Sequence, residues 1–347
     1  PYLEAPFEGA LALMTRVARR GVGAALTGLQ LPSLDALARR HLRSPRLQQF
    51  VGRFATYAGA SPYEASAAFA MIPHLERAFG VHHVEGGMAT LVTALAQALL
   101  RLGVEVRLGR RATWRAQGKT LLAGDPEDLQ TFDSVVVNED PLRGVPAPLA
   151  LSGYVLLLDV DRRLTLPHHS VAFTADPRRE FDALFRGELP EATTLYVCHP
   201  AASDPTVAPA GRSGLFVMVN APALRGPEDE AAWDAHARRL RERCLAAVYR
   251  LAPEAIGADV QVLGERTPVD LLRGGAPGGS IYGFLPHGRF GPFGRPRMRA
   301  ATRGVFFAGG GTHPGGGVPL VMLSGHFAST LVRQHLGTTP GQEARRP

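Results

Sequence analysis

A glycine-rich loop between two apolar segments is the part of this sequence best suited to hold a ligand. Val305-Phe-Phe-Ala308 is typical of a buried strand, six glycines follow within residues 309–317, and an apolar helix with Pro319 in its first turn is expected over about 318–335. Glycines let a backbone approach a ligand closely. The start of the following helix offers free N–H groups and about half a positive charge. The N1–C2=O edge of a flavin, which becomes negative on reduction, fits such a site; the alternative is a glycine-rich turn and helix cap without a ligand.

The spacing within this loop excludes two common nucleotide sites. It lacks the Gly-Lys-Ser/Thr of a P-loop, and it is not a GxGxxG fingerprint at a first βα turn. The pairs His82-His83 and His168-His169 invite a metal site. Adjacent residues of a regular element point to different faces, and no cysteine or carboxylate stands at ligand spacing along the chain. The sequence therefore predicts no metal.

The elements that would position the glycine loop follow from hydrophobic periodicity. An amphipathic helix is expected after Gly87, with one buried stripe, and Gly103 ends it as a C′ glycine. The apolar positions of this stripe are Leu91, Val92, Leu95, Leu99 and Leu102. Strands are expected over 104–108 and 134–137, separated by a turn-rich insert. Further strands over 153–159, 194–198 and 214–219 and a charged helix over 228–250 predict a second domain built on a mixed sheet.

Composition bounds the class of protein. The apolar share is 45% and the charged share 20%, as in ordinary globular chains. The net charge is +7, Lys119 is the only lysine, and the arginines are scattered without a run of five. This pattern argues against a nucleic-acid partner and favours an anionic membrane surface. Cys198 and Cys244 form no CxxC pair, which favours a reducing, cytoplasmic location, and no apolar run is long enough to span a bilayer.

Several ordered motifs resemble the bacterial phytoene desaturase type of carotenoid desaturases, which are FAD-dependent members of the amine-oxidase-like flavoproteins. The resemblance runs from about residue 40 to residue 335. It is carried by Thr312-His-Pro-Gly-Gly-Gly-Val-Pro319, Tyr57-Ala-Gly-Ala-Ser-Pro-Tyr-Glu-Ala65, Ile72-Pro-His-Leu-Glu-Arg-Ala-Phe-Gly-Val81, Val84-Glu-Gly-Gly-Met88, Leu195-Tyr-Val-Cys-His-Pro200 and Ile281-Tyr-Gly-Phe284 with Gly288-Arg289. It implies an α/β fold, with a partial Rossmann-like FAD-binding domain and a substrate domain of mixed sheet and helices.

The resemblance also implies site residues. Flavin contacts are expected in the glycine loop, at Gly310, Gly311, Thr312, Gly317 and Val318, with Pro319 shaping the helix start. Adenine-side contacts are expected at Arg111 and Ala112, although the Asn-Thr and valine typical of the family are replaced there by Gly109-Arg110 and Ala112.

Two residues are candidates for catalysis. His313 either contacts the flavin or substrate or orients the loop by a hydrogen bond. Glu76 either removes a proton from the substrate or pairs with Arg77 on a helix surface, and the surface pair is the favoured interpretation. Phe69, Tyr154, Phe216 and Phe284 are candidates for an apolar tunnel, although each alone is typical of ordinary core.

The domain organisation expected from these assignments has five parts. They are a helical, substrate- or membrane-facing part over 1–80, portions of the FAD domain over 81–150 and 276–337, a substrate domain over 151–275, and a disordered tail over 338–347. The apolar segment Gly21–Leu31 either dips into a membrane or packs on the core. The sequence starts at Pro1 and has no GxGxxG segment for the FAD pyrophosphate. We therefore expect a fragment that binds FAD poorly by itself.

The function implied by the resemblance is FAD-dependent desaturation of a carotenoid, of the phytoene desaturase or hydroxycarotenoid 3,4-desaturase type. Because an apolar polyene resides in the bilayer, peripheral attachment to the cell membrane is expected as well. Two alternatives stay open: an amine-oxidase-like flavoenzyme acting on a polar amine, and a flavin-free protein that binds carotenoid or membrane. Oligomeric state is not predicted.

Overall fold

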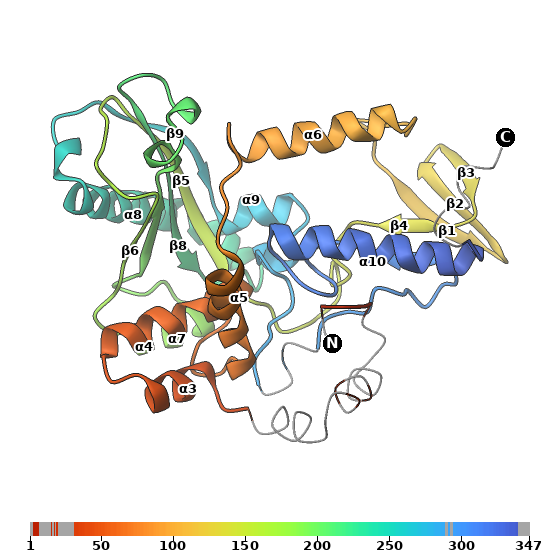
Figure 1. Cartoon of the computed structure of the whole chain (residues 1–347), viewed down its shortest axis with the longest axis horizontal. Coiled ribbons are helices and arrows are strands. Elements are labelled where there is room, and N and C mark those ends of the chain that lie inside the picture. Colours follow the sequence, from red (N-terminus) through yellow and green to blue (C-terminus); the bar gives the residue numbers. More distant parts are fainter. Residues whose placement is uncertain are drawn as a thin grey trace. The chain divides into compact units, whose positions relative to one another are not determined.

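Two compact units, each assembled from separated stretches of chain, make up the structure. It is a computed structural model that describes residues 3–6, 15, 17, 19, 31–288, 291 and 294–338 (Figure 1). The first unit comprises residues 1–69, 107–148 and 282–347, and the second comprises 70–106 and 149–281. The expected membrane-dipping segment, except Leu31, and the expected tail, except Thr338, lie outside the described residues, as does Arg289. Within the described part, no helix is both long and apolar enough to cross a membrane.

The second unit is built on a five-stranded sheet with the order β6-β7-β8-β5-β9. Its elements are α5 (Met71–Phe79), α6 (Met88–Arg101), β5 (Ser152–Val160), β6 (His169–Ala172), α7 (Pro177–Arg186), β7 (Leu195–Cys198), β8 (Ser213–Ala221), α8 (Pro227–Leu251), β9 (Val260–Arg266) and α9 (Pro268–Arg273), with short 3₁₀ turns η3 to η6. The combination of helices and strands confirms the α/β class. The sheet of this unit, expected to be mixed, has only antiparallel strand pairs.

The core of the second unit follows directly from periodicity. Alternate residues of β5, from Tyr154 to Val160, are buried on one face of the sheet. Buried residues of α8, from Trp233 to Val248, recur three or four positions apart, and these two sets belong to one apolar cluster. The same alternation places the other residues of β5, β7 and β8 on the opposite, outer face.

The first unit holds the glycine loop. Its elements are α3 (Leu34–His41), α4 (Pro45–Gly52), η1 (Arg53–Ala58), β1 (Thr113–Gln117), β2 (Thr120–Asp125), β3 (Asp128–Phe132), β4 (Val135–Val137), β10 (Val305–Phe307) and α10 (Val318–Leu336); η2 (Ala67–Ala70) runs across the border of the two units. β4 and β10 form a parallel pair, and Phe306 packs with Phe327 and Leu331 of α10. Ser33 caps α3 by accepting a hydrogen bond from the Ala36 amide at 3.2 Å, a role that serine often has at the start of a helix.

Three local expectations are wrong. Residues 104–108 pair with no strand among the described residues, because alternation makes a strand only where a partner supplies the ladder. The turn-rich insert is a three-stranded antiparallel sheet, β1-β2-β3. Helix α6 forms and ends before Gly103, at φ 73°, as expected, but it has no buried residue. Periodicity gives a helix its apolar side, but burial needs a partner on that side.

Candidate functional site

The glycine loop, residues 308–317, lies at the carboxyl ends of two parallel strands. Val305 pairs with Val135 and Phe307 with Val137, so the chain leaves both strands at the same edge. Ligands of parallel α/β sheets bind outside this edge. The segment after β4 lies directly against the loop: a Cβ added at Gly309 would collide with the Asn138 side chain, and one at Gly311 would lie 2.7 Å from the Asp140 carboxyl group. Side chains at these two positions would push the loop away from β4.

Polar side chains fix the loop from its protein side. Ser324 of α10 is fully buried, and its Oγ accepts a hydrogen bond from the Gly309 amide at 3.0 Å. The Arg295 guanidinium donates to the Gly310 carbonyl at 2.9 Å. Thr312 Oγ1 donates to the Pro296 carbonyl at 2.7 Å. Side-chain hydrogen bonds therefore hold the loop at Gly309, Gly310 and Thr312. These bonds fix the path of its backbone.

The N-terminus of α10 is open where the loop ends. Its N-cap, Gly317, has φ 99° and supplies no side-chain acceptor. An added Cβ at Gly317 would meet nothing within 4 Å, and Val318 is 44% exposed. The first-turn amides that a capping side chain would otherwise occupy thus remain available to a ligand. Together with the positive charge of Arg295 beneath the loop, they favour an electron-rich group.

His313 lies inside the first unit. It is fully buried, and its ring stacks on Phe327 of α10 with centroids 5.5 Å apart and an interplanar angle of 11°. The His313–Pro314 peptide bond is cis. The imidazole of His313 thus packs against α10.

The other predicted site residues lie elsewhere. Arg111 and Ala112 are exposed and immediately precede β1, in a different sheet of the first unit from the glycine loop. Glu76 is half-buried on α5, which belongs to the second unit, and its neighbour Arg77 is exposed. The predicted loop residues thus lie together, whereas Arg111, Ala112 and Glu76 lie in other parts of the structure.

Four residues that support the loop were not predicted as site residues. Asn138, Asp140, Tyr282 and Arg295 line its protein side: a Cβ at Gly316 would lie 2.7 Å from the Tyr282 ring, and burial raises the pKa of Tyr282. Asn138 and Asp140 had a usable signal, because they directly follow a predicted strand. Arg295 had none, since no pattern links it to Gly310.

The outer face of the five-stranded sheet is the second candidate surface. Cross-strand register places Val171, Tyr196, Met218 and Val155 in one row, and Cys198, Phe216 and Leu157 in the next. These side chains are half-buried or, like Leu157 at 43%, exposed, and none is charged. Polar residues end both rows: the first continues to Arg266 of β9, and the second begins at His169 of β6. An open apolar surface of this kind is typical of a binding site for an apolar ligand or partner.

Comparison with known proteins identifies the family. Residues 24–333 match the family described as flavin containing amine oxidoreductase. The chain belongs to this family. Its cofactor is accordingly FAD.

Two curated relatives and one solved structure illustrate the similarity. The chain is 35% identical to a hydroxyneurosporene desaturase of Cereibacter sphaeroides, over 94% of this chain and 70% of the relative. It is 32% identical to a 4,4'-diapolycopene oxygenase of a Methylomonas species, over 85% and 63%. An oxidoreductase from Methanosarcina mazei superposes with a TM-score of 0.57 at 18% identity, covering 86% of this chain and 68% of that one, which supports the fold. The chain thus spans less than two thirds of the length of the Methylomonas relative.

The glycine loop and α10 fit the electron-accepting end of FAD. The uncapped first turn of α10 offers N–H donors, and among the described residues no atom beyond its chain neighbours lies within 4 Å of a Cβ added at Gly317. Gly309 and Gly311 keep the loop flat against Asn138 and Asp140. The positive end of a helix of 19 residues would stabilise negative charge on the bound ring system.

Proposed function

We propose that this protein is an FAD-dependent carotenoid desaturase of the hydroxycarotenoid 3,4-desaturase or phytoene desaturase type. The observation that carries the proposal is the pair of apolar rows on the outer face of the sheet in the second unit, in a chain of this flavoprotein family. The identity with hydroxyneurosporene desaturase supports it. A polyene offers only apolar surface and presents nothing for a charged side chain to recognise, so a face of Tyr196, Met218, Phe216 and Leu157 suits it.

The reaction removes two hydrogens from neighbouring carbons of the chain. FAD, when bound, accepts one of them as a hydride, and the other leaves as a proton to a base or to water, so that a new C=C bond extends the conjugation. The protein's share is alignment and exclusion of water. The apolar rows would hold the polyene extended, and Glu76 is the proposed proton acceptor.

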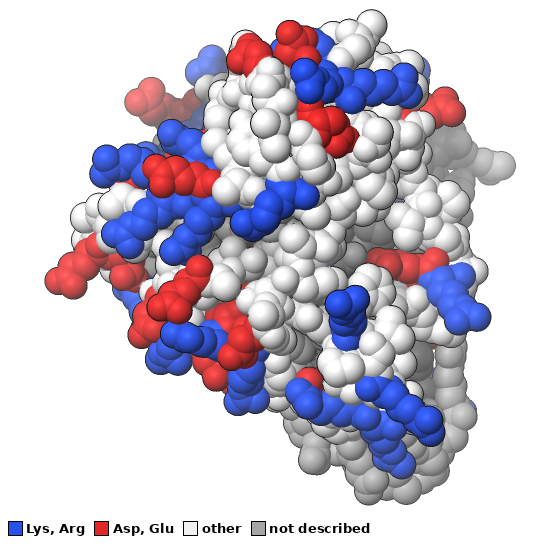
Figure 2. Space-filling view, turned by 90° about the vertical axis from the view of Figure 1, so that its left-hand side faces the viewer, with Lys and Arg blue, Asp and Glu red and all other residues white. Residues whose placement is uncertain are grey.

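We further propose that the protein attaches to the surface of an anionic membrane through α3 and α4. Arg39, Arg40, Arg43 and Arg46 are exposed there, next to Leu47 and Phe50 at 52% and 49% exposure. Figure 2 shows blue side chains gathered at the lower end of the face it draws, at the level of α3 and α4 in Figure 1, whereas blue and red alternate above. Arginines beside exposed apolar side chains favour binding to anionic lipid headgroups.

Anaerobic absorption spectroscopy of the flavin-loaded protein tests the activity. Carotenoids added in liposomes should bleach the oxidised-flavin band and shift the polyene absorption to longer wavelength. A flavin that stays oxidised with every carotenoid but bleaches with primary amines would instead identify an amine oxidase. A protein that binds no flavin even with FAD in large excess would overturn the enzymatic proposal.

A pair of variants tests the substrate face. Leu157→Asp places a charge within the apolar rows and should weaken carotenoid-dependent bleaching, while flavin content stays normal. Ile256→Asp is the matched control and should have no effect, because Ile256 is 64% exposed on the turn that follows the 3₁₀ helix η5 (Pro253–Ala255). Equal effects of the two variants would refute the assignment of this face.

A further inference from the structure

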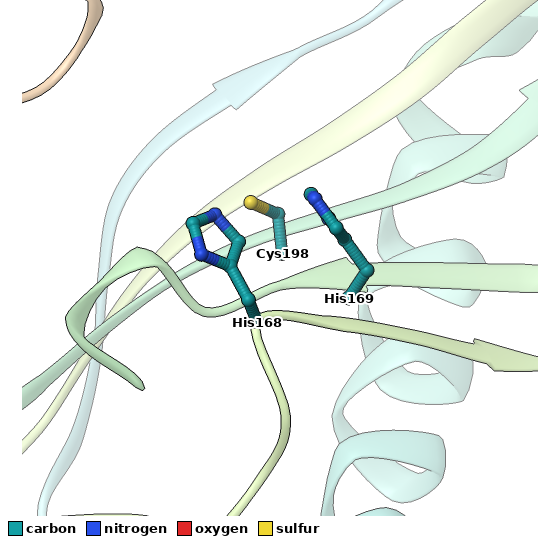
Figure 3. A group of neighbouring side chains, drawn as sticks. All are labelled: His168, His169 and Cys198. Carbon is teal, nitrogen blue, oxygen red and sulfur yellow. The ribbon is translucent and has the colours of Figure 1, made fainter. Parts of the chain in front are cut away.

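Three side chains with metal-binding atoms meet at the edge of the sheet in the second unit. His169 of β6 is directly opposite Cys198 of β7 in the antiparallel register, and His168 immediately precedes β6. One ligand atom from each of the three lies within 4.8 Å of the other two. Figure 3 shows the Cys198 sulfur between the two imidazole rings.

This cluster corrects the argument made from spacing. Adjacent histidines diverge on a regular strand, but His168 lies outside β6, and the ring centroids of His168 and His169 are only 4.5 Å apart. Cys198 is far away along the chain and is brought to them by strand pairing alone. The expectation that no cysteine stands at ligand distance is therefore wrong in space, although it is right along the sequence.

The hydrogen bonds around the two histidines prepare their outer nitrogens. Nδ1 of His168 is 2.8 Å from Ser203 Oγ, and Nδ1 of His169 is 2.9 Å from the Tyr196 hydroxyl. With Nδ1 engaged in each ring, Nε2 is the nitrogen that remains to bind a cation. Histidine ligands of metals are typically oriented in this way, by a partner on the second ring nitrogen.

A third histidine and a carboxylate lie beside the cluster. The ring of His83 is 5.2 Å from that of His168, and its Nε2 is 3.2 Å from the Asp204 carboxylate. A cation at the cluster would therefore have a carboxylate close by, beyond His83.

We propose that His168, His169 and Cys198 form a binding site for a divalent transition-metal ion such as zinc. Zinc binds imidazole nitrogens and cysteine thiolates, with bonds of about 2.0–2.3 Å, and a set of two histidines and one cysteine is also a copper donor set. Tetrahedral geometry at those lengths separates ligand atoms by about 3.3–3.6 Å, so small rotamer changes suffice from the observed spacing. Cys198 releases its thiol proton to solvent on binding, and water fills the fourth position.

Such a site would fasten the start of β6 to the end of β7, at the open edge of the sheet. β6 is a strand of four residues and lies at the edge of the sheet, where it pairs with β7 alone. A metal bond between His169 and Cys198 would add a link at its first residue. This inference is independent of the proposed flavin chemistry.

Cobalt(II) is the direct probe, because a cobalt–thiolate bond gives a charge-transfer band in the near ultraviolet. The metal-free protein titrated with Co²⁺ should develop this band with one ion bound per chain, and Zn²⁺ should displace it. Cys198→Ser should abolish the band. His169→Ala, at an exposed position, should weaken Co²⁺ binding at least about tenfold.

His82→Ala is the matched control, because His82 is exposed in the same unit and contacts the Phe79 carbonyl instead of the cluster. It should leave the titration unchanged. Zinc should also slow the labelling of Cys198 by a thiol reagent, with little signal from Cys244, which is only 1% exposed. Absence of the band in the unaltered protein, its persistence in Cys198→Ser, or an equal loss in His82→Ala would overturn the proposal.

Discussion

The hydrogen bond between Ser324 and Gly309 offers a sensitive test of how the glycine loop is held. Ser324→Ala removes one oxygen from a fully buried position and leaves the Gly309 amide without its 3.0 Å acceptor. Losing such a partner costs about 1–3 kcal/mol. The gain in helix propensity from serine to alanine offsets about 0.5 kcal/mol of this. We therefore expect a net loss of about 0.5–2.5 kcal/mol in the free energy of unfolding of the first unit.

Thermal unfolding and retained flavin provide the two readouts. The midpoint of thermal unfolding should fall by about 1–10 °C, and the variant should release flavin more readily, because the loop start is no longer fixed to α10. Ser329→Ala is the matched control: Ser329 is exposed on the same helix and accepts a bond from Arg333 at 2.9 Å. If the two variants were equally stable and retained equal flavin, the reasoning about the loop would be refuted.

Three further predictions concern the loop, an acid-sensitive turn and the membrane surface. Gly311→Ala should lower flavin content, because the added Cβ would lie 2.7 Å from the Asp140 carboxyl group. Gly325→Ala, in open space on α10, should retain flavin and stabilise the helix by up to about 1 kcal/mol. Hydrogen bonds from Thr206 and the Gly86 amide hold the pKa of Asp204 below its usual range, so its contribution to stability is complete above about pH 4 and is lost as pH falls toward the folded-state pKa. The difference between the urea midpoints at neutral and at acid pH should therefore be smaller in Asp204→Asn than in the unaltered protein. An unchanged difference would contradict this. Arg43→Gln with Arg46→Gln should weaken binding to anionic vesicles about 30-fold, at about 1 kcal/mol per arginine, while Arg238→Gln with Arg239→Gln on α8 should bind as the unaltered protein does.

Local signals in the sequence predict most elements of this fold. The strand before the glycine loop, the loop itself and α10 follow from an apolar run, six glycines and a helical apolar pattern. Alternation likewise predicts β5, β7 and β8. In each case the residues within one element carry the information, because burial on one side of a strand or helix sets the period.

Contacts between distant segments account for what the sequence missed. No pattern in the sequence links Ser324 to Gly309, yet its hydroxyl accepts a hydrogen bond from the Gly309 amide. Asp140 and Arg295 approach the loop from other stretches of chain. The meeting of Cys198 with His168 and His169 depends on the register of β6 and β7, which no single segment encodes. Strand pairing and register are collective properties of the folded sheet, so they appear only in the structure.

The interleaved make-up of the two units has a consequence for biosynthesis. β4 has its parallel partner, β10, only after residue 307 has been synthesised, whereas all the strands of the second unit are complete by residue 266. A chain emerging from the ribosome can therefore assemble the antiparallel sheet before β4 (Val135–Val137) has its hydrogen-bonding partner β10. Pairings of such long sequence separation form slowly and leave apolar strands exposed in the meantime. The glycine loop, which follows β10, would accordingly be among the last parts to form.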